Sequence, residues 1–463
     1  MTLVESFSGI RGIYGQSITK EIVYKYAFLY AKLFLDKNSI VIVARDTRIS
    51  GLEVSSTVIE AFNDFGVAKI IDLGIVPIQV CEYYILKSEA KGGIYITASH
   101  NEPEYNGFKI LKEDGSILYA EQMQKLIEAV HQNKNIATQN KETIEPENQN
   151  KKAIGNYINH ILDYLGSDNL EKIKQAQFKI LLDPNGGSAI NVLSSLCERL
   201  GVEAEVIHNK LGEFKRLVEP NSESLKYLEP QLKNSDYKFA AGFDCDADRV
   251  ELVLPSGQTL SGQYVLALAA DSFLADTDNQ IVVTNDCTSY LVSEVIEKYK
   301  AKTIEVEVGE TNVVKEMEIQ KSGIGGEGSN GGVVVFPIKC RDGIMTMALI
   351  LKMMAQRSGD LISILSKYPK YYSDRVKVNC SAEEVVEIKN KIEEQFQVQG
   401  LAIQKTGDDT GGLKIMFDDK SYLWFRQSKT EAGAFRIIAD GDEVNKVKNI
   451  LKQGIDLFNE FKK

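Results

Sequence analysis

The chain has 463 residues, of which 43% are hydrophobic and 26% charged, as in ordinary globular proteins. Its 54 basic and 65 acidic residues leave a formal net charge of −11, which argues against a protein that holds nucleic acid by bulk charge. At about 100–200 residues per domain, the length predicts three or four domains and a sizeable core.

The N-terminus, the longest apolar segments and the cysteine content indicate the compartment and the contact with membranes. The N-terminal sequence lacks a basic segment followed by a long apolar run, so no secretory signal is expected. The most apolar segments, 264–275 and 344–355, fall short of the roughly 18–20 residues that cross a membrane and are predicted to be buried helices. Six scattered cysteines without a CxxC pair, and only four histidines, favour neither a disulfide framework nor a histidine-based metal centre. We therefore expect a cytoplasmic protein with no membrane contact.

One local pattern occurs three times along the chain: an apolar strand runs into a polar loop and then a helix. The predicted strands are 40–44, 179–182 and 281–284, and the helices that follow are 52–65, 189–200 and 289–300. Strand, loop and helix form the repeating unit of a parallel or mixed sheet. The pattern therefore predicts three α/β domains of related build.

The end of the chain follows a different pattern. Strands are predicted at 376–378, 413–417, 422–425 and 435–439, with helices at 382–397 and 443–461 and a Gly/Asp-rich loop at 406–412. Strands and helices without strict alternation indicate an α+β domain. A polar linker at 133–150, a turn at 256–258 after a strand at 250–254, and a boundary near 366–375 separate the parts. We expect domains at 1–150, 151–254, 255–368 and 369–463.

The first chemical motif is GIYITASHNEPEYNGFK, residues 93–109. A short strand at 94–97 ends in a polar loop, and Ser99 lies just past the strand end, where loops present reactive groups. His100 and Lys109 follow within a few residues. By these residues alone, either a reactive serine with nearby cations or a plain polar turn remains open.

The second motif, GFDCDADR at 242–249, places Asp244, Asp246 and Asp248 at alternate positions. This spacing puts three carboxylates on one side of an extended or looping segment. Three hard oxygen ligands without a His or Cys pair suit Mg²⁺. The alternative is a solvated acidic turn, although the apolar runs on both sides favour metal binding.

Two further motifs lie in the second half of the chain. Residues 325–332, GGEGSNGG, contain five glycines in eight positions, which lets the backbone approach a ligand or simply makes a flexible turn. Residues 426–436 supply two guanidinium groups and two hydroxyls, on Arg426, Ser428, Thr430 and Arg436. Arginine forks match phosphate oxygens in bidentate fashion, although a solvated strand face is the plain alternative.

The four motifs, in this order, resemble those of the α-D-phosphohexomutase family, the phosphoglucomutases and phosphomannomutases. TASHN–EYNG–K resembles its phosphoserine loop, DCDADR its metal loop, GGEGSNGG its sugar-binding loop and RxSxTE its phosphate-binding loop. FSGIRG at 7–12 resembles its N-terminal motif, which puts Arg11 in the active site. The matches extend over essentially the whole chain.

The sequence departs from the family's motifs at several positions. Glu102 stands where Pro is usual, Cys245 replaces Gly in the metal loop, and Lys429 replaces Gly in the phosphate-binding loop. In the sugar-binding loop the family's His is absent, and Asn330 and Gly331 occupy that region. This form is closer to the GGEGNGG loops of mutases with mixed sugar preference. Glu310 also departs from the family's usual sugar-contacting element.

The resemblance implies three related α/β domains with mixed sheets and a C-terminal α+β domain around a central cleft. It also implies an isomerase that interconverts hexose 6-phosphate and hexose 1-phosphate, with mannose or glucose as the sugar. Ser99 would be phosphorylated, would give its phosphoryl group to the sugar phosphate, and would regain a phosphoryl group from a 1,6-bisphosphate. A hexose 1,6-bisphosphate is the expected activator.

The resemblance also assigns roles to residues. Ser99 and the three aspartates, Asp244, Asp246 and Asp248, would hold Mg²⁺. The expected catalytic residues are Ser99, Arg11, His100, Lys109 and Arg249, with Lys109 or His100 as general acid and base. Sugar contacts would come from Glu327, Ser329 and Asn330. The non-reacting phosphate would be held by Arg426, Ser428, Thr430 and Arg436.

Three alternatives stay open at this stage. The protein could be a phosphoglucosamine mutase, or a non-catalytic sugar-phosphate-binding protein with degenerate loops. It could also be a haloacid-dehalogenase-like phosphatase, because Asp244-Cys245-Asp246 resembles that DxD motif. That chemistry wants Thr or Val two residues further on, where this chain has Asp248. A monomer or a homodimer that binds small sugar phosphates is expected.

Overall fold

The computed structural model describes residues 3–133, 143–329, 331–357, 359–418, 420–429 and 433–462. The chain divides into two compact units, Met1–Leu260 with Gly332–Leu361, and Ser261–Gly331 with Ile362–Lys463. Half of the predicted linker at 133–150 lies outside the described residues. No helix of the described part has both the length and the apolar character required to cross a membrane.

The first unit begins with a seven-stranded mixed sheet. Its strands are β1 (Val4–Ser6), β2 (Gly9–Ile13), β3 (Ile40–Arg45), β4 (Lys69–Ile75), β5 (Gly92–Ile96), β6 (Tyr105–Lys112) and β7 (Glu147–Asn148), and its helices are α1 (Lys20–Phe34), α2 (Gly51–Phe65), α3 (Ile78–Leu86) and α4 (Ala120–Gln132). The strand order is β1-β2-β6-β5-β3-β4-β7. Val41 and Val43 of β3 pack with α1, α2 and α4, while Ile42 and Ala44 are buried on the other face. Burial on both faces explains the unbroken apolar run that predicted this strand.

A four-stranded sheet follows in the same unit. Its strands are β8 (Lys179–Asp183), β9 (Glu203–Val206), β10 (Ala240–Phe243) and β11 (Val250–Val253), with helices α5 (Asn150–Leu165), α6 (Ser167–Ala176), α7 (Ile190–Leu200) and α8 (Glu229–Leu232) and a 3₁₀ turn η1 (Lys226–Leu228). Strands β9, β8 and β10 are parallel, and β11 pairs antiparallel with β10. The loop that joins β10 to β11 carries the three predicted metal ligands. The predicted turn after β11 is confirmed by a backbone hydrogen bond from Leu254 N to Gln258 O at 2.9 Å.

The elements between residues 262 and 356 are divided between the two units. The second unit holds α9 (Gly262–Leu274), β12 (Ile281–Asn285), α10 (Tyr290–Glu297), β13 (Lys302–Val306), α11 (Glu310–Gln320) and β14 (Ile324–Gly326), and the first unit holds β15 (Val333–Val335), β16 (Arg341–Asp342) and α12 (Gly343–Gln356). Strands β13 and β14 pair parallel with β12, and β15 pairs antiparallel with β16. The two apolar segments predicted as buried helices are α9 and α12, and both are almost wholly buried.

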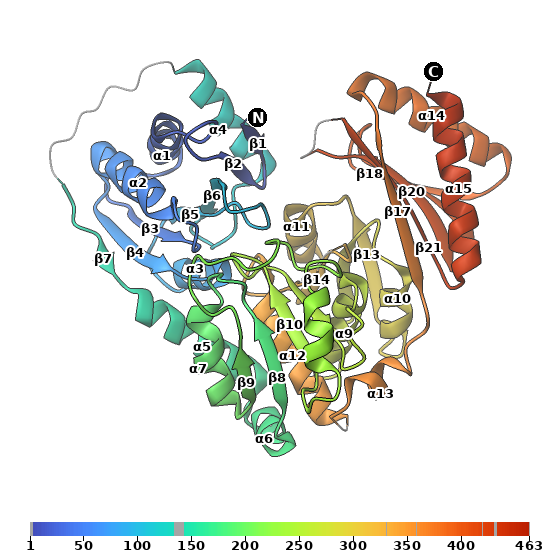
Figure 1. Ribbon diagram of the computed structural model, residues 1–463. Coiled ribbons are helices and arrows are strands. Elements are labelled where there is room, and N and C mark those ends of the chain that lie inside the picture. Colours follow the sequence, from blue (N-terminus) through green and yellow to red (C-terminus); the bar gives the residue numbers. More distant parts are fainter. Residues whose placement is uncertain are drawn as a thin grey trace. The chain divides into compact units, whose positions relative to one another are not determined.

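The C-terminal elements form an antiparallel sheet with helices on one face (Figure 1). They are α13 (Leu361–Leu365), β17 (Tyr372–Asn379), α14 (Ala382–Val398), β18 (Ala402–Thr406), β19 (Gly412–Asp418), β20 (Ser421–Gln427), β21 (Ala434–Gly441) and α15 (Val444–Phe461), with strand order β17-β21-β20-β19-β18. Helix α14 begins with a capping box between Ser381 and Glu384. Phe435 and Ile437 of β21 pack against α15 in a continuous core.

The observed elements confirm the predicted fold class of three α/β domains and a C-terminal α+β domain. In the C-terminal domain, the sequence analysis predicts no strand over β18, and β17 begins at Tyr372, before the predicted strand at 376–378 and within the segment predicted as a boundary. Both are edge strands with exposed polar residues, so they lack the apolar pattern that reveals buried strands. The predicted domain ranges and central cleft stay predictions.

The second unit contains a buried carboxylate with few partners. Asp440 on β21 accepts hydrogen bonds at Oδ1 from Ser289 Oγ at 2.9 Å and from Tyr290 N at 3.3 Å. Its Oδ2 has no hydrogen-bond partner among the described residues. Burial raises the pKa of the Asp440 carboxyl to about 7. The hydrogen bonds from Ser289 and Tyr290 favour the ionised form and offset only part of this increase. The charged form of this side chain therefore destabilises the fold.

We expect Asp440→Asn to change how stability depends on pH. The folded protein retains a proton on Asp440 up to about pH 7, while an unfolded Asp carboxyl ionises near pH 4, at about 3.9. The contribution of this group to the free energy of unfolding therefore falls as pH rises from about 4 to 7 and then stays low. The variant loses this slope, so it should gain on the order of 2–4 kcal/mol relative to the parent between pH 5 and pH 8.

Thermal and urea unfolding at pH 5, 6, 7 and 8 measures this difference. Asp442→Asn is the control, because Asp442 lies two residues away and its ion pair with Lys446 is partly exposed. A pH slope for Asp440→Asn equal to that of the parent would contradict the expectation.

Candidate active site

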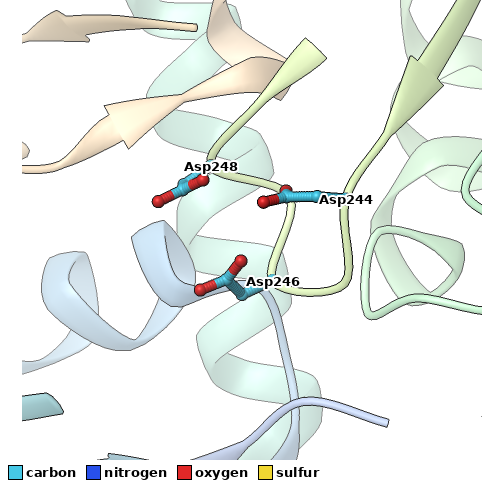
Figure 2. A group of neighbouring side chains, drawn as sticks. All are labelled: Asp244, Asp246 and Asp248. Atoms are coloured by element: carbon cyan, nitrogen blue, oxygen red, sulfur yellow. The ribbon is translucent and has the colours of Figure 1, made fainter. Parts of the chain in front are cut away.

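Three carboxylates converge in the loop between β10 and β11. Asp244, Asp246 and Asp248 are buried, and one carboxylate oxygen from each lies within 4.8 Å of the others. Figure 2 shows all three side chains on the same turn of the chain, directed toward a common region. Ala247 adopts a left-handed φ of 60°, which tightens the turn between the second and third aspartate. The structure thus brings together the carboxylates that the alternate spacing predicts on one side.

The donor set of this cluster fits a hard divalent cation. Oδ1 of Asp246 and Oδ1 of Asp248 are buried, and neither has a hydrogen-bond partner in the described part of the chain. Burial, followed by the charges of Asp248 and Asp246, raises the pKa of Asp244 well above its usual value. Mutual repulsion of this kind is relieved when a cation binds, and carboxylate oxygens are the ligands that Mg²⁺ prefers.

Cationic side chains surround the aspartates. Lys109 Nζ, on β6, lies 3.3 Å from Asp246 Oδ2 and 3.4 Å from Asp248 Oδ2, and Arg341 Nη2 lies 3.1 Å from the same oxygen of Asp248. Although burial alone would raise the pKa of Asp248, Arg341, Lys109 and Arg249 outweigh it and lower that pKa. Asp248 therefore stays ionised, whereas burial and the neighbouring carboxylates disfavour the ionised form of Asp244.

Arg249 directly follows the third aspartate, at the end of the GFDCDADR motif. Its backbone N–H donates to Asp244 Oδ1 at 3.2 Å, and its Nε lies 3.9 Å from both Asp244 Oδ2 and Asp248 Oδ1. Its Nη1 donates to the carboxylate of Glu219. Glu219 thus holds the guanidinium at the edge of the aspartate cluster, where it can meet an anionic ligand.

The predicted nucleophile reaches this cluster from the first sheet. Ser99 follows β5 in a left-handed conformation with φ of 50°, and its Oγ donates to Asp244 Oδ2 at 3.4 Å. Its backbone N–H donates to Thr97 Oγ1 at 2.7 Å, and Thr97 in turn donates to Asp246 Oδ2 at 3.3 Å. The serine hydroxyl therefore lies beside the proposed metal ligands, as the resemblance to the family implies.

His100 and Arg11, which were also predicted to be catalytic, lie near the same aspartate cluster. The positive charge of Arg249, then burial and Arg11, lower the pKa of His100 well below its usual value. Its Nδ1 is buried without a hydrogen-bond partner among the described residues. Arg11 lies on β2, opposite Gly107 of β6. Burial lowers the pKa of Arg11, while the nearby charges of Asp246 and Asp248 act in the other direction.

Arg48 braces the loop that carries Ser99. Its side chain is completely buried, and its Nε pairs with Asp46 Oδ2 at 3.1 Å. The two terminal nitrogens donate to four backbone carbonyls, those of Ser99 at 2.7 Å, Asn101 at 2.6 Å, Glu102 at 2.6 Å and Tyr105 at 3.0 Å. One guanidinium therefore determines the path of the whole loop.

Sequence reasoning did not assign Arg48, Arg341 or Glu219 to the site. A signal for Arg48 was present, because it lies in the polar loop directly after β3, at the strand end where ligands bind in α/β sheets. Glu219 lies in a long irregular segment with no pattern of its own, so only the tertiary structure reveals it.

Two departures from the family motifs have clear structural surroundings. Glu102 Oε1 accepts a hydrogen bond from Val218 N at 3.3 Å, which links the Ser99 loop to the segment that carries Glu219. Cys245 is buried with its Sγ 3.6 Å from Thr47 Oγ1.

The remaining predicted residues lie in the second unit. Glu327 follows β14 and its Oε1 accepts hydrogen bonds from Asn285 Nδ2 at 3.1 Å and Gly309 N at 2.9 Å. Ser329 is exposed two residues later. Arg426 and Arg436 occupy directly paired positions on β20 and β21. Ser428 follows β20, and Asn330 and Thr430 lie outside the described residues.

Comparison with known proteins identifies relatives across the chain. Models for the phosphoglucomutase/phosphomannomutase alpha/beta/alpha domains I, II and III match residues 5–137, 155–257 and 261–372. A phosphoglucomutase/phosphomannomutase of Thermococcus kodakarensis is 30% identical over 98% of this chain and 97% of the relative. A phosphoglucosamine mutase of Prochlorococcus marinus is 27% identical over 98% of each chain. A phosphoglucosamine/phosphogalactosamine mutase of Sulfurisphaera tokodaii is 29% identical over 96% of each.

Solved structures show the same fold. A phosphoglucomutase/phosphomannomutase family protein of Burkholderia thailandensis matches with a TM-score of 0.81 at 20% identity, over 99% of this chain and 97% of that one. A phosphomannomutase-like protein of Thermus thermophilus matches with a TM-score of 0.80 at 21% identity, over 99% of each. An N-acetylphosphoglucosamine mutase of Aspergillus fumigatus, solved with GlcNAc-6P and magnesium, has a TM-score of 0.59 at 14% identity, over 93% and 84%.

We expect Arg48→Met to destabilise the first unit strongly. Methionine retains most of the volume but leaves four carbonyls without their donor and Asp46 without its counter-ion, all in buried surroundings. The loss of one partner of a buried charged network costs about 3–5 kcal/mol in the free energy of unfolding. Urea unfolding of the full chain measures it. Arg199→Met is the matched control, because Arg199 is exposed and its side chain donates a hydrogen bond to Asn159 on the surface. Equal losses in the two variants would refute the bracing role.

Proposed function

This chain belongs to the phosphoglucomutase/phosphomannomutase family, the α-D-phosphohexomutases, whose members are isomerases, and we propose that it interconverts hexose 6-phosphates and hexose 1-phosphates of mannose and glucose. The observation that carries the proposal is the position of Ser99. Its hydroxyl lies 3.4 Å from Asp244, inside a cluster of three carboxylates and several cations. This is the environment that phosphoryl transfer through a serine requires.

In the proposed reaction, phosphorylated Ser99 is the donor. The bond between phosphorus and Ser99 Oγ breaks as a bond forms between phosphorus and a free hydroxyl oxygen of the sugar monophosphate. The proton of that hydroxyl passes to His100 or Lys109. The resulting 1,6-bisphosphate reorients, its other phosphoryl group returns to Ser99 Oγ, and the proton returns to the sugar oxygen that is released.

The residues of the first unit would share the work of charge stabilisation. Arg249, held by Glu219, and Lys109 would face the non-bridging oxygens of the phosphoryl group, together with Arg11. Mg²⁺ bound by Asp244, Asp246, Asp248 and an oxygen on Ser99 would supply Lewis-acid neutralisation of the same group. In the second unit, Glu327, Ser329 and Asn330 would contact the sugar, and Arg426, Ser428, Thr430 and Arg436 would hold the other phosphate.

The identity of the sugar is the finer part of the proposal. The loop at 325–332 favours mannose and glucose phosphates, and the relative from Thermococcus kodakarensis carries a name for both activities. Phosphoglucosamine mutase is the second candidate, because other relatives of similar identity carry that name. The cytoplasmic location and the monomeric or dimeric state expected from the sequence also stay predictions.

A coupled assay with the 6-phosphates of mannose, glucose and glucosamine, each with glucose 1,6-bisphosphate as activator, tests the function. We expect turnover of mannose and glucose phosphates at similar kcat/KM and slower turnover of the glucosamine phosphate. Ser99→Ala is the control for the covalent route and should lose at least about a thousandfold of kcat, since a nucleophile is removed. Activity of Ser99→Ala within tenfold of the parent would exclude the phosphoserine route, and a preference for glucosamine phosphate would favour the second candidate.

Removal of the divalent cation should abolish turnover. We expect a chelator to lower kcat by at least about a hundredfold, with recovery on addition of Mg²⁺, because the cation neutralises the transferred group. Asp246→Asn should weaken Mn²⁺ binding measured by calorimetry, because Asp246 contributes a buried oxygen with no other partner among the described residues. Asp168→Asn, an exposed position on α6, is the control. Undiminished Mn²⁺ affinity in Asp246→Asn would count against the site.

A further inference from the structure

The proposed phosphate-binding arginine of the second unit already holds a carboxylate of the protein itself. Arg426 lies near the end of β20 with its side chain only 8% exposed. Its Nη2 donates to Glu307 Oε1 at 3.1 Å and to the Val308 carbonyl at 3.4 Å. Lys429 Nζ lies 2.6 Å from the same Glu307 oxygen. One oxygen of Glu307 therefore bridges the two cations.

Among the described residues, the four side chains paired in this group carry balanced charges. Lys429 also pairs with Asp408 Oδ2 at 3.0 Å, so two cations face two carboxylates. The carboxylates differ in exposure, since the side chain of Glu307 is 14% exposed and that of Asp408 is 63% exposed. A phosphate dianion that approaches Arg426 would add two negative charges to a neutral group. The nearly buried Glu307 would oppose it much more strongly than Asp408.

The segment that carries Glu307 also contacts the predicted sugar-binding loop. Gly309 N, two residues after Glu307, donates to Glu327 Oε1 at 2.9 Å. Arg426 Nε is buried and has no hydrogen-bond partner among the described residues, so the guanidinium has an unused donor. Residues 307–309 thus contact both the predicted sugar ligand Glu327 and the predicted phosphate ligand Arg426.

We infer that Glu307 is an internal competitor for the substrate's phosphate group, which holds Arg426 and Lys429 when no ligand is bound and must release Arg426 when phosphate binds. The inference rests on the proposed function, because it takes Arg426 as a phosphate anchor. Competition of this kind lowers phosphate affinity and speeds release. Release is needed during the reaction, since the bisphosphate must give up one phosphate contact before it can offer the other.

Glu307→Gln tests the inference. Glutamine retains the shape and one oxygen acceptor for Arg426, removes the charge, and replaces the second oxygen by an amide donor. We would titrate full-length protein in a Ser99→Ala background, which prevents turnover, with inorganic phosphate and with glucose 6-phosphate. Glu307→Gln should lower both dissociation constants about tenfold, because a nearly buried like charge is removed beside the bound dianion. In the Ser99 form it should lower KM and lower kcat, as release slows.

Asp408→Asn is the matched control, because it removes a carboxylate from the same lysine at an exposed position and, in the described part of the chain, forms no ion pair with Arg426. Its dissociation constants should change about twofold or less. Melting temperatures verify that each variant is folded, and Glu307→Ser serves as a second charge-removing variant with the same expectation. Unchanged or raised dissociation constants in folded Glu307 variants would overturn the inference and make Glu307 a structural support of Arg426.

Arg426→Gln separates this inference from the function on which it rests. If Arg426→Gln binds both ligands as the parent does, the proposed phosphate anchor is wrong, and the inference fails with it. If Arg426→Gln binds much more weakly while Glu307→Gln does not tighten binding, the anchor stands and only the competition is refuted.

Discussion

Three buried carboxylates that converge on one point are the constraint on which the first unit depends. Burial and mutual repulsion oppose the ionised state, as the raised pKa of Asp244 indicates. Lys109 of β6, Arg341 of β16 and Arg249 of the loop itself offset this cost. Because Lys109 and Arg341 lie far from this loop in the sequence, the offset depends on how β6 and β16 pack beside the loop.

A second layer of contacts orients the groups that would meet the substrate. Arg48 donates hydrogen bonds to the carbonyls of the Ser99 loop. These bonds hold the serine in a left-handed conformation that the backbone alone disfavours. Glu219 holds Arg249, and Glu102 ties the serine loop to the segment of Glu219. Preorganised charges stabilise a transition state without reorganisation at the moment of reaction, which is why such supports matter for phosphoryl transfer.

In each unit, cations pair locally with carboxylates of the protein, and this pairing is independent of the net charge of the chain. The chain carries −11 overall, yet several of its cations gather beside the aspartate cluster and beside Glu307. In the first unit, Lys109, Arg341 and Arg249 face three aspartates. In the second, Arg426 and Lys429 face Glu307 and Asp408. Each group of cations is thus held by carboxylates of the protein, and the ligand must replace or complement them.

From the sequence alone, the apolar strands buried on both faces predict the fold class, and the spacing of the aspartates favours a metal site. For Ser99 the residues left a reactive serine and a polar turn open, and only the resemblance to a family favoured the first. Edge strand β18 was not predicted and β17 was predicted only over 376–378, because their polar faces lack that pattern. Only the tertiary structure decided that Arg48, Arg341 and Glu219 support the site and that Glu307 bridges Arg426 and Lys429. Their partners lie 50 to more than 100 residues away in some cases, as with Arg48 and Ser99, which are separated by 51 residues, and Arg426 and Glu307, separated by 119. Pairings at such separations depend on how the elements pack, and no local pattern of residues specifies them.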